Sequence, residues 1–191
     1  MRAEIQVRTG EQMRALGRRL AGLLCPGDLV VLTGPLGAGK TTLVQGIGEG
    51  LGVRGPVTSP TFVIARVHRS LSGGPALVHA DAYRLGSRAE VDDLDLDADL
   101  DSSVTVVEWG EGLVEDLSAS HLEIRIMLAP RTVPPGTPGL TAAASPDGAE
   151  VPDEPRIVQL TGTGSRWEAA GPSAGPAGSC WAEALPGTAG A

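Results

Sequence analysis

The first periodic pattern in the chain is that of an amphipathic helix over residues 11–24, with Gly27 as its stop. Its apolar positions recur every three or four residues: Met13, Leu16, Leu20, Leu23 and Leu24. The unbroken apolar run Leu29–Leu32 follows and is typical of a strand buried on both faces of a parallel sheet. A second helix ends at Gly52, with apolar positions at Leu43, Ile47 and Leu51. The pattern therefore predicts a helix packed on a sheet, then a strand, a glycine-rich segment and a helix.

Five more segments have β-type character: Phe62–Val67, Leu77–Ala80, Val104–Val107, Leu122–Leu128 and Ile157–Leu160. Residues 71–75, LSGGP, have the composition of a hairpin turn between the first two. The last two alternate apolar with polar residues, so we expect paired strands at one edge of the sheet. Together the elements predict an α/β fold with a mostly parallel sheet and added antiparallel edge strands.

Composition limits the part of this 191-residue chain that can build a core. Glycines and prolines, 27 and 15 in number, concentrate in residues 129–155 and again after residue 170. Segments of this kind bury too little apolar surface to offset the entropy of ordering them. We therefore expect one domain over residues 1–168, interrupted by a disordered insertion at 129–155 and followed by a disordered tail at 169–191.

Charge argues against direct binding of nucleic acid over a broad surface. The net charge is −8, and no basic cluster exceeds a pair such as Arg18 and Arg19, so a partner would have to hold any RNA. The chain has no run of about 18 apolar residues and no signal-peptide pattern at its start, which predicts a cytoplasmic protein without a membrane partner. Cys25 and Cys180 lack the spacing of a zinc site and are expected to be incidental thiols.

The glycine-rich segment GPLGAGKTT, residues 34–42, matches G-x-x-x-x-G-K-[ST] at every position and stands between a predicted strand and a predicted helix. In such a loop the backbone N–H groups face phosphates, the lysine reaches the β and γ oxygens, and the threonine hydroxyl binds Mg²⁺. We therefore expect a nucleoside triphosphate and Mg²⁺ as ligands. The predicted binding residues are Gly34, Leu36, Gly37, Ala38, Gly39, Lys40, Thr41 and Thr42, with Thr41 also at the metal.

One compositional fact strengthens this interpretation. Lys40 is the only lysine in the chain, and all the other residues among the 15 basic ones are arginines. A P-loop needs a compact ammonium that fits inside the curled backbone, and a planar guanidinium is a poor substitute there. The single lysine stands where this chemistry requires one.

A P-loop enzyme also needs a carboxylate near the end of a neighbouring buried strand, to hold Mg²⁺ or its waters. Asp81 and Glu108 each follow a predicted strand, so both qualify, and their positions alone do not rank them. The histidines are scattered: a surface or strand-end position is expected for His68 and His121, and only His79 begins a motif.

Four segments, in order, resemble those of the TsaE family, also called YjeE: GPLGAGKTT at 34–42, VTSPTF at 57–62, HADAYRL at 79–85 and VEWGE at 107–111. That family is the small bacterial ATPase required to make threonylcarbamoyladenosine beside the tRNA anticodon. The resemblance runs from the first predicted helix to about Trp167, apart from the insertion, and four ordered motifs are far more specific than a P-loop alone. It implies a P-loop NTPase-like three-layer sandwich that binds ATP and Mg²⁺.

The resemblance also implies roles for individual residues. Lys40, Thr41 and Thr42 would bind phosphates and Mg²⁺, and Glu108 would be a Mg²⁺ ligand. Residues 59–62 resemble a switch-like loop. The other residues implied in nucleotide contact or turnover are Asp81, Trp109, Thr9, Gly10 and Arg156. Asp81, Glu108 and Thr61 are each candidates for orienting the attacking water.

Two positions depart from the family pattern. Pro35 stands where the family usually has aspartate, and Ala82 where it usually has leucine or valine. Neither change removes the remaining loop amides, so nucleotide binding is still expected.

The function that the resemblance implies is ATP hydrolysis that resets or activates a partner complex, the TsaD and TsaB subunits, which carries out threonylcarbamoyl transfer. This chain would then contact tRNA only indirectly, through its partners, in agreement with its net negative charge. Two alternatives share the P-loop: a small-molecule kinase, and a nucleotide-gated binding module in which ATP only fixes the switch loop.

Overall fold

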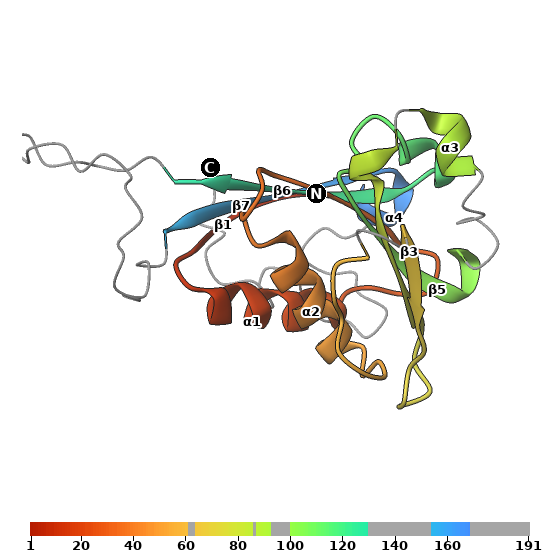
Figure 1. The fold of residues 1–191 in the computed structure, drawn as a ribbon, viewed down its shortest axis with the longest axis horizontal. Coiled ribbons are helices and arrows are strands. Elements are labelled where there is room, and N and C mark those ends of the chain that lie inside the picture. Colours follow the sequence, from red (N-terminus) through yellow and green to blue (C-terminus); the bar gives the residue numbers. More distant parts are fainter. Residues whose placement is uncertain (61–63, 86, 93–99, 130–153, 169–191) are drawn as a thin grey trace, which may run out of the picture.

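Seven strands form one mixed sheet in the order β1-β7-β6-β2-β5-β4-β3 (Figure 1). The structure is a computed structural model that describes residues 1–60, 64–85, 87–92, 100–129 and 154–168. The strands are β1 (Arg2–Val7), β2 (Leu29–Thr33), β3 (Ala65–His68), β4 (Ala76–Asp81), β5 (Ser103–Glu108), β6 (His121–Leu128) and β7 (Arg156–Thr163). The helices are α1 (Gly10–Ala21), α2 (Lys40–Gly50), α3 (Arg88–Asp92) and α4 (Ser165–Glu168), with 3₁₀ turns η1 (Ala82–Arg84), η2 (Leu100–Ser102) and η3 (Glu115–Leu117).

Four parallel strands occupy the centre of the sheet. β2 pairs in parallel with β5 and β6, and β5 pairs in parallel with β4. Antiparallel pairing continues at both edges, through β7 and β1 on one side and β3 on the other. Residues Leu29–Leu32 of β2 are all buried, as expected for a central strand covered on both faces. The predicted α/β fold with a parallel centre and antiparallel edges is confirmed.

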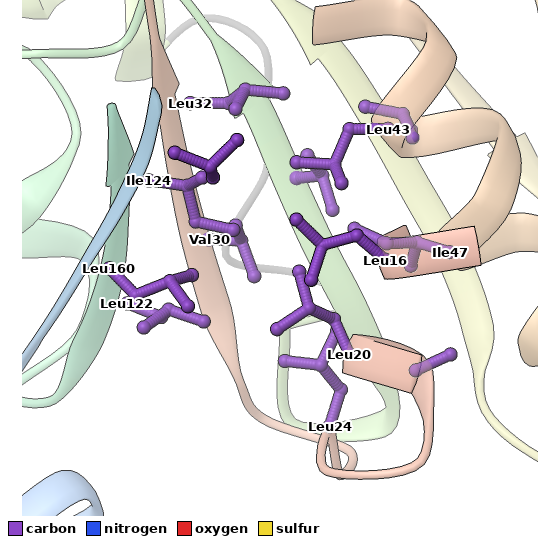
Figure 2. Packing of buried hydrophobic residues seen from close by; sticks show 14 of the residues in the cluster. Leu16, Leu20, Leu24, Val30, Leu32, Leu43, Ile47, Leu122, Ile124 and Leu160 are labelled. Atoms are coloured by element: carbon purple, nitrogen blue, oxygen red, sulfur yellow. The ribbon is translucent and has the colours of Figure 1, made fainter. Parts of the chain in front are cut away.

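The two faces of the sheet are covered by layers of unequal size. α1 and α2 lie side by side on one face, and α3 lies on the other (Figure 1). The apolar side chains that meet between α1, α2 and the sheet include Leu16, Leu20, Leu43, Ile47, Val30, Ile124 and Leu160 (Figure 2). On the opposite face the described residues that cover the sheet come from short elements, among them Ala82 of η1, Val91 of α3 and Leu100 of η2. None of the described helices has the length and apolar character needed to cross a bilayer.

α1 and α2 approach each other at glycines. A Cβ on Gly46 would lie 2.1 Å from the carbonyl oxygen of Arg14, and a Cβ on Gly17 would lie 2.3 Å from that of Leu43. Both distances are shorter than real Cβ contacts, so the helices pack backbone against backbone at these positions. Arg18 adds an exposed ion pair across the contact, with Nη1 2.8 Å from Glu49 Oε2, and such pairs contribute little to stability.

The structure departs most clearly from the predicted elements at the end of α1 and at β1. α1 ends at Ala21, and the N–H of Gly22 bonds back to the Arg19 carbonyl, so Leu24 reaches the core from a turn and not from the helix. The sequence analysis also misses β1, although Ile5 and Val7 alternate with polar residues and are buried. Residues 61–63, at the start of the strand predicted over 62–67, lie outside the described residues.

β6 and β7 form the antiparallel pair expected from their alternation, and the edge strand beyond them is β1. The pair closes where Ala129 N–H donates to the Pro155 carbonyl at 2.9 Å. The residues on either side of segment 130–153 therefore lie at adjacent positions of the sheet. Residues 130–153 and 169–191 lie outside the described part, so the disorder and domain limits predicted there stay predictions.

Two histidines are buried at strand ends. His68 ends β3 and His121 begins β6, with 6% and 8% of their surface exposed. Of the two positions expected for these histidines, the strand end is confirmed, and the surface is wrong because both side chains are buried. Burial lowers the pKa of His68 below its ordinary value, and the neighbouring His79 and Arg66 lower it further.

This shift predicts a contribution of His68 to acid unfolding. Because the folded-state pKa is below the unfolded value near 6.5, the unfolded chain takes up the proton first as the pH falls. The contribution is complete above pH 6.5 and is lost as the pH falls through the folded-state pKa. We expect urea titrations between pH 7.5 and 5.5 to show a smaller pH dependence of the free energy of unfolding for His68→Gln than for the wild type. Parallel curves for the two proteins would contradict this assignment.

Candidate nucleotide-binding site

The glycine-rich loop joins the carboxyl end of β2 to the start of α2. Gly34 has φ +145°, and a Cβ there would lie 2.4 Å from the carbonyl oxygen of Ile126, so only glycine fits against β6. Gly39 has φ +103° and caps α2, which begins at Lys40. The loop thus turns directly into the N-terminus of a helix, an arrangement that presents backbone N–H groups to an anion.

A cavity of about 490 Å³ opens above this loop. Its lining residues are Leu36, Gly37, Gly39, Lys40, Thr41, Thr42, Ser59, Asp81, Tyr83, Glu108 and Trp109. They come from the loop, from α2, from the segment before β3 and from the carboxyl ends of β4 and β5. Ligands of open α/β sheets bind at this end of the strands. The structure therefore brings most of the predicted nucleotide-binding and catalytic residues to one cavity.

Lys40 is held at the floor of the cavity. Its Nζ donates to the carbonyls of Gly34 and Pro35 at 2.8 and 3.0 Å, and it lies 3.8 Å from the ring centroid of Trp109. Burial lowers the pKa of Lys40, and the carboxylates of Glu108 and Asp81 oppose that shift. The ammonium thus contacts two carbonyl oxygens and a ring face, and two nearby carboxylates favour its charged form.

Strand alternation aims three polar side chains of β4 and β5 at α2. Alternate residues of a strand point to the same face of the sheet. His79 and Asp81 therefore share a face with Leu77, and Glu108 shares a face with Val106. Leu77 and Val106 both pack in the core beneath α1 and α2. The parallel register places Asp81 directly across from Glu108. The two candidate carboxylates are therefore neighbours on one face.

Glu108 contacts the loop, and Asp81 does not share that contact. Thr41 Oγ1 donates to Glu108 Oε1 at 3.0 Å, and His79 Nε2 lies 2.9 Å from the same oxygen. Asp81 instead caps η1, accepting from Tyr83 N at 3.0 Å, and its other oxygen lies 3.5 Å from Ser59 Oγ. Only 3% of Glu108 and 7% of Asp81 are exposed. One carboxylate thus faces the loop threonine, and the other faces the predicted switch-like loop.

Trp109 has a strained backbone at the rim of the cavity. Its φ is +61°, a conformation rare for residues other than glycine, and its N–H donates to the Leu32 carbonyl at 2.9 Å. The indole lies against Lys40 Nζ, and the ring of Tyr83 packs against it at a tilt, with ring centroids 5.3 Å apart. Such strain is concentrated at functional sites.

Gly34 does not line the cavity, and neither do four further residues predicted at the site. Ala38 is fully buried inside the loop. Thr9 caps α1 through a 3.1 Å bond from Gln12 N, and Gly10 is the first residue of that helix. Arg156 lies beside the loop: its Nε is 4.0 Å from the position of a Cβ on Gly39 and is buried without a partner among the described residues. Thr61, also predicted at the site, lies outside the described residues.

The sequence analysis misses the contacts of His79 and Tyr83. His79 is fully buried against Glu108, and Tyr83 is the ring partner of Trp109. A signal for His79 exists in the sequence, because it stands two residues before Asp81 in a strand and must share its face. No comparable signal links Tyr83 to Trp109.

The donor set fits Mg²⁺ and a triphosphate. A hydroxyl and a carboxylate, Thr41 and Glu108, meet at the helix start, and oxygen ligands of this kind suit Mg²⁺ held jointly with phosphates. The N-terminus of α2, the ammonium of Lys40 and the unpartnered Nε of Arg156 all favour an anion at the loop.

Two proteins with similar sequences carry the name of the family whose profile matches this chain. The sequence profile of the family described as "Threonylcarbamoyl adenosine biosynthesis protein TsaE" matches residues 7–132. A Streptomyces coelicolor protein named tRNA threonylcarbamoyladenosine biosynthesis protein TsaE is 60% identical over 159 residues, which cover 83% of this chain and 95% of that protein. A Bacillus subtilis protein of the same name is 39% identical over 120 residues, or 62% and 73% of the two chains.

A solved structure shares the fold. The crystal structure of YdiB from Bacillus subtilis superposes with a TM-score of 0.63 and 29% identity, over 88% of this chain and 90% of that one. The family profile spans more than half of the chain, from β1 through the P-loop to the end of β6. On these grounds the chain belongs to the TsaE family.

Proposed function

We propose that this chain binds ATP with Mg²⁺ and hydrolyses it, as a subunit needed to form threonylcarbamoyladenosine in tRNA. The observation that carries the proposal is the bond between Thr41 and Glu108, which unites a P-loop hydroxyl and a strand-end carboxylate beside Lys40. The names of the relatives supply the tRNA modification.

Each residue of the cavity has a part in the proposed reaction. Lys40 would exchange the carbonyls of Gly34 and Pro35 for phosphate oxygens, and the loop amides would bind the same phosphates. Thr41 and Glu108 would hold Mg²⁺, which when bound neutralises the charge that develops on the β and γ phosphates. Asp81, anchored by Tyr83 N, is the carboxylate left to orient a water.

The partners in this proposal are TsaD and TsaB, the subunits that transfer the threonylcarbamoyl group. The net charge of −8 favours a chain that acts on a protein complex while the partners hold the tRNA. The same role would place the chain in the cytoplasm, where tRNA is modified. No arginine lines the cavity in the described part of the chain, whereas kinases of small molecules usually close an arginine-bearing lid over the phosphates.

The single lysine offers a direct test of nucleotide binding. Amine-reactive labelling followed by peptide mass spectrometry reports on two groups only, Lys40 and the N-terminal amine. The lowered pKa of Lys40 raises the fraction of reactive neutral amine. We expect Mg²⁺ and ATP to protect Lys40 strongly and adenosine, which lacks phosphates, to leave it unprotected. The N-terminal amine serves as the internal control. An equal extent of Lys40 labelling with and without ATP would refute the proposal.

A further inference from the structure

His79 is a buried polar residue to which the proposed reaction assigns no part. It lies in β4, with none of its surface exposed, and it does not line the cavity. Its Nε2 is 2.9 Å from Glu108 Oε1, while its Nδ1 is buried without a partner among the described residues. A buried histidine with a single polar contact, and that contact at the proposed Mg²⁺ ligand, needs an explanation.

The direction of this hydrogen bond follows from the chemistry of the two groups. An ionised carboxylate only accepts, so the shared proton belongs to the imidazole and sits on Nε2. His79 is anchored by a central strand between β5 and β3, and its ring cannot move without disturbing the core around it. The ring therefore fixes the position of one carboxylate oxygen of Glu108.

Thr41 donates a hydrogen bond to the same oxygen of Glu108. Its hydroxyl donates to Glu108 Oε1 at 3.0 Å, so this oxygen accepts from both residues. In the proposed function the Thr41 oxygen would also bind the cation through a lone pair, so the direction of its O–H bond to Glu108 would depend on the metal. His79 is the donor to Glu108 whose position does not depend on the cation.

We propose that His79 is a positioning residue, which holds the Glu108 carboxylate toward the P-loop and acts only through Glu108. The inference rests on the proposed function, because it assigns Glu108 to the cation. Partners of this kind, which bond to a metal-binding side chain, typically change metal affinity by roughly 10 to 100-fold when removed. The competing role for His79 is to fill space in the core, and in that role its loss would not change the affinity for Mg²⁺.

The test compares His79→Gln, whose amide can still donate to Glu108, with His79→Leu, which fills the space without a donor. Calorimetry measures the affinity for a non-hydrolysable ATP analogue in EDTA and again in Mg²⁺, and the ratio of the two is the Mg²⁺ enhancement. We expect the Mg²⁺ enhancement to be at least about tenfold smaller in His79→Leu than in the wild type, and close to the wild-type value in His79→Gln. Affinities in EDTA should be similar in all three proteins.

Two outcomes would overturn the inference: full enhancement in His79→Leu, or equal loss in both variants. If His79→Leu does not fold, His79→Asn replaces it, since its shorter amide should not reach Oε1 and should lose the enhancement as well. A second readout needs no nucleotide. Long-range ¹H–¹⁵N spectra should place the His79 proton on Nε2 and should shift that signal in Glu108→Gln, and a proton on Nδ1 would refute the bond. A wild type that binds no analogue would instead refute the proposed function, and the spectra would still decide the bond.

Discussion

Glu108→Gln is expected to keep the wild-type affinity for ATP in EDTA, to lose at least about tenfold of the Mg²⁺ enhancement of that affinity, and to hydrolyse ATP at least about 100-fold more slowly. Glutamine has the shape of glutamate and can still accept from Thr41, so the P-loop should keep its form. It lacks the negative charge that would hold Mg²⁺ and set its position against the phosphates. Losing one group of this kind at a site of developing charge typically lowers kcat by roughly 10² to 10³. Binding is measured by calorimetry and hydrolysis by phosphate release.

Glu111→Gln is the matched control for that experiment. Glu111 is three residues away, exposed, and paired with Arg125 outside the cavity, so its loss should leave hydrolysis unchanged. Both variants and the wild type should be assayed alone and with TsaD and TsaB, which we expect to stimulate the wild type. Full hydrolysis in Glu108→Gln would contradict the role of this carboxylate. ATP binding without hydrolysis in the wild type, even with both partners, would favour the nucleotide-gated binding module.

Gly46→Ala is expected to lower the free energy of unfolding by about 3 kcal/mol, the upper end of the usual cost of overpacking a core. The added Cβ would lie 2.1 Å from the carbonyl oxygen of Arg14, a backbone atom that moves only if α1 moves. Intrinsic helix propensity alone predicts the opposite sign, because alanine favours a helix over glycine by about 1 kcal/mol. Urea unfolding at pH 7.5 therefore separates the two effects by sign.

Gly10→Ala provides the comparison within the same pair of helices. A Cβ on Gly10 would meet nothing within 4 Å, so we expect its free energy of unfolding to stay within about 1 kcal/mol of the wild type. Gly46→Ala with unchanged stability would show that α1 and α2 separate at no cost, and that the glycine contact does not fix their spacing.

Local pattern and chemistry were enough to predict the central fold. Leu29–Leu32 was predicted as a buried strand because it has no polar position, and the P-loop was located by its order between strand and helix. α1 was predicted too long, since Leu23 and Leu24 continue the helical spacing although the helix has already ended at Ala21. Apolar spacing reports which residues face the core, and a turn can satisfy it as well as a helix.

The candidate site was predicted as a set of residues but not as a geometry. Asp81 and Glu108 could not be ranked, because their separation depends on the register between β4 and β5, which no local pattern encodes. The same holds for His79 against Glu108 and for the ring of Trp109 over Lys40. In each case the partners are at least 27 residues apart in the chain, and Trp109 also meets Lys40 through an unusual backbone angle.

The junction between Ala129 and Pro155 has a practical consequence for work on this chain. The two residues are joined by a 2.9 Å hydrogen bond at the end of the β6–β7 pair, so the sheet itself holds together the ends of whatever lies between them. Loop closure becomes only about 0.6 kcal/mol harder with each doubling of length. This junction is therefore a place to add a fluorescent reporter or an affinity tag, or to shorten the chain for crystallisation, with the β6–β7 pair intact and Arg156 kept beside the glycine-rich loop.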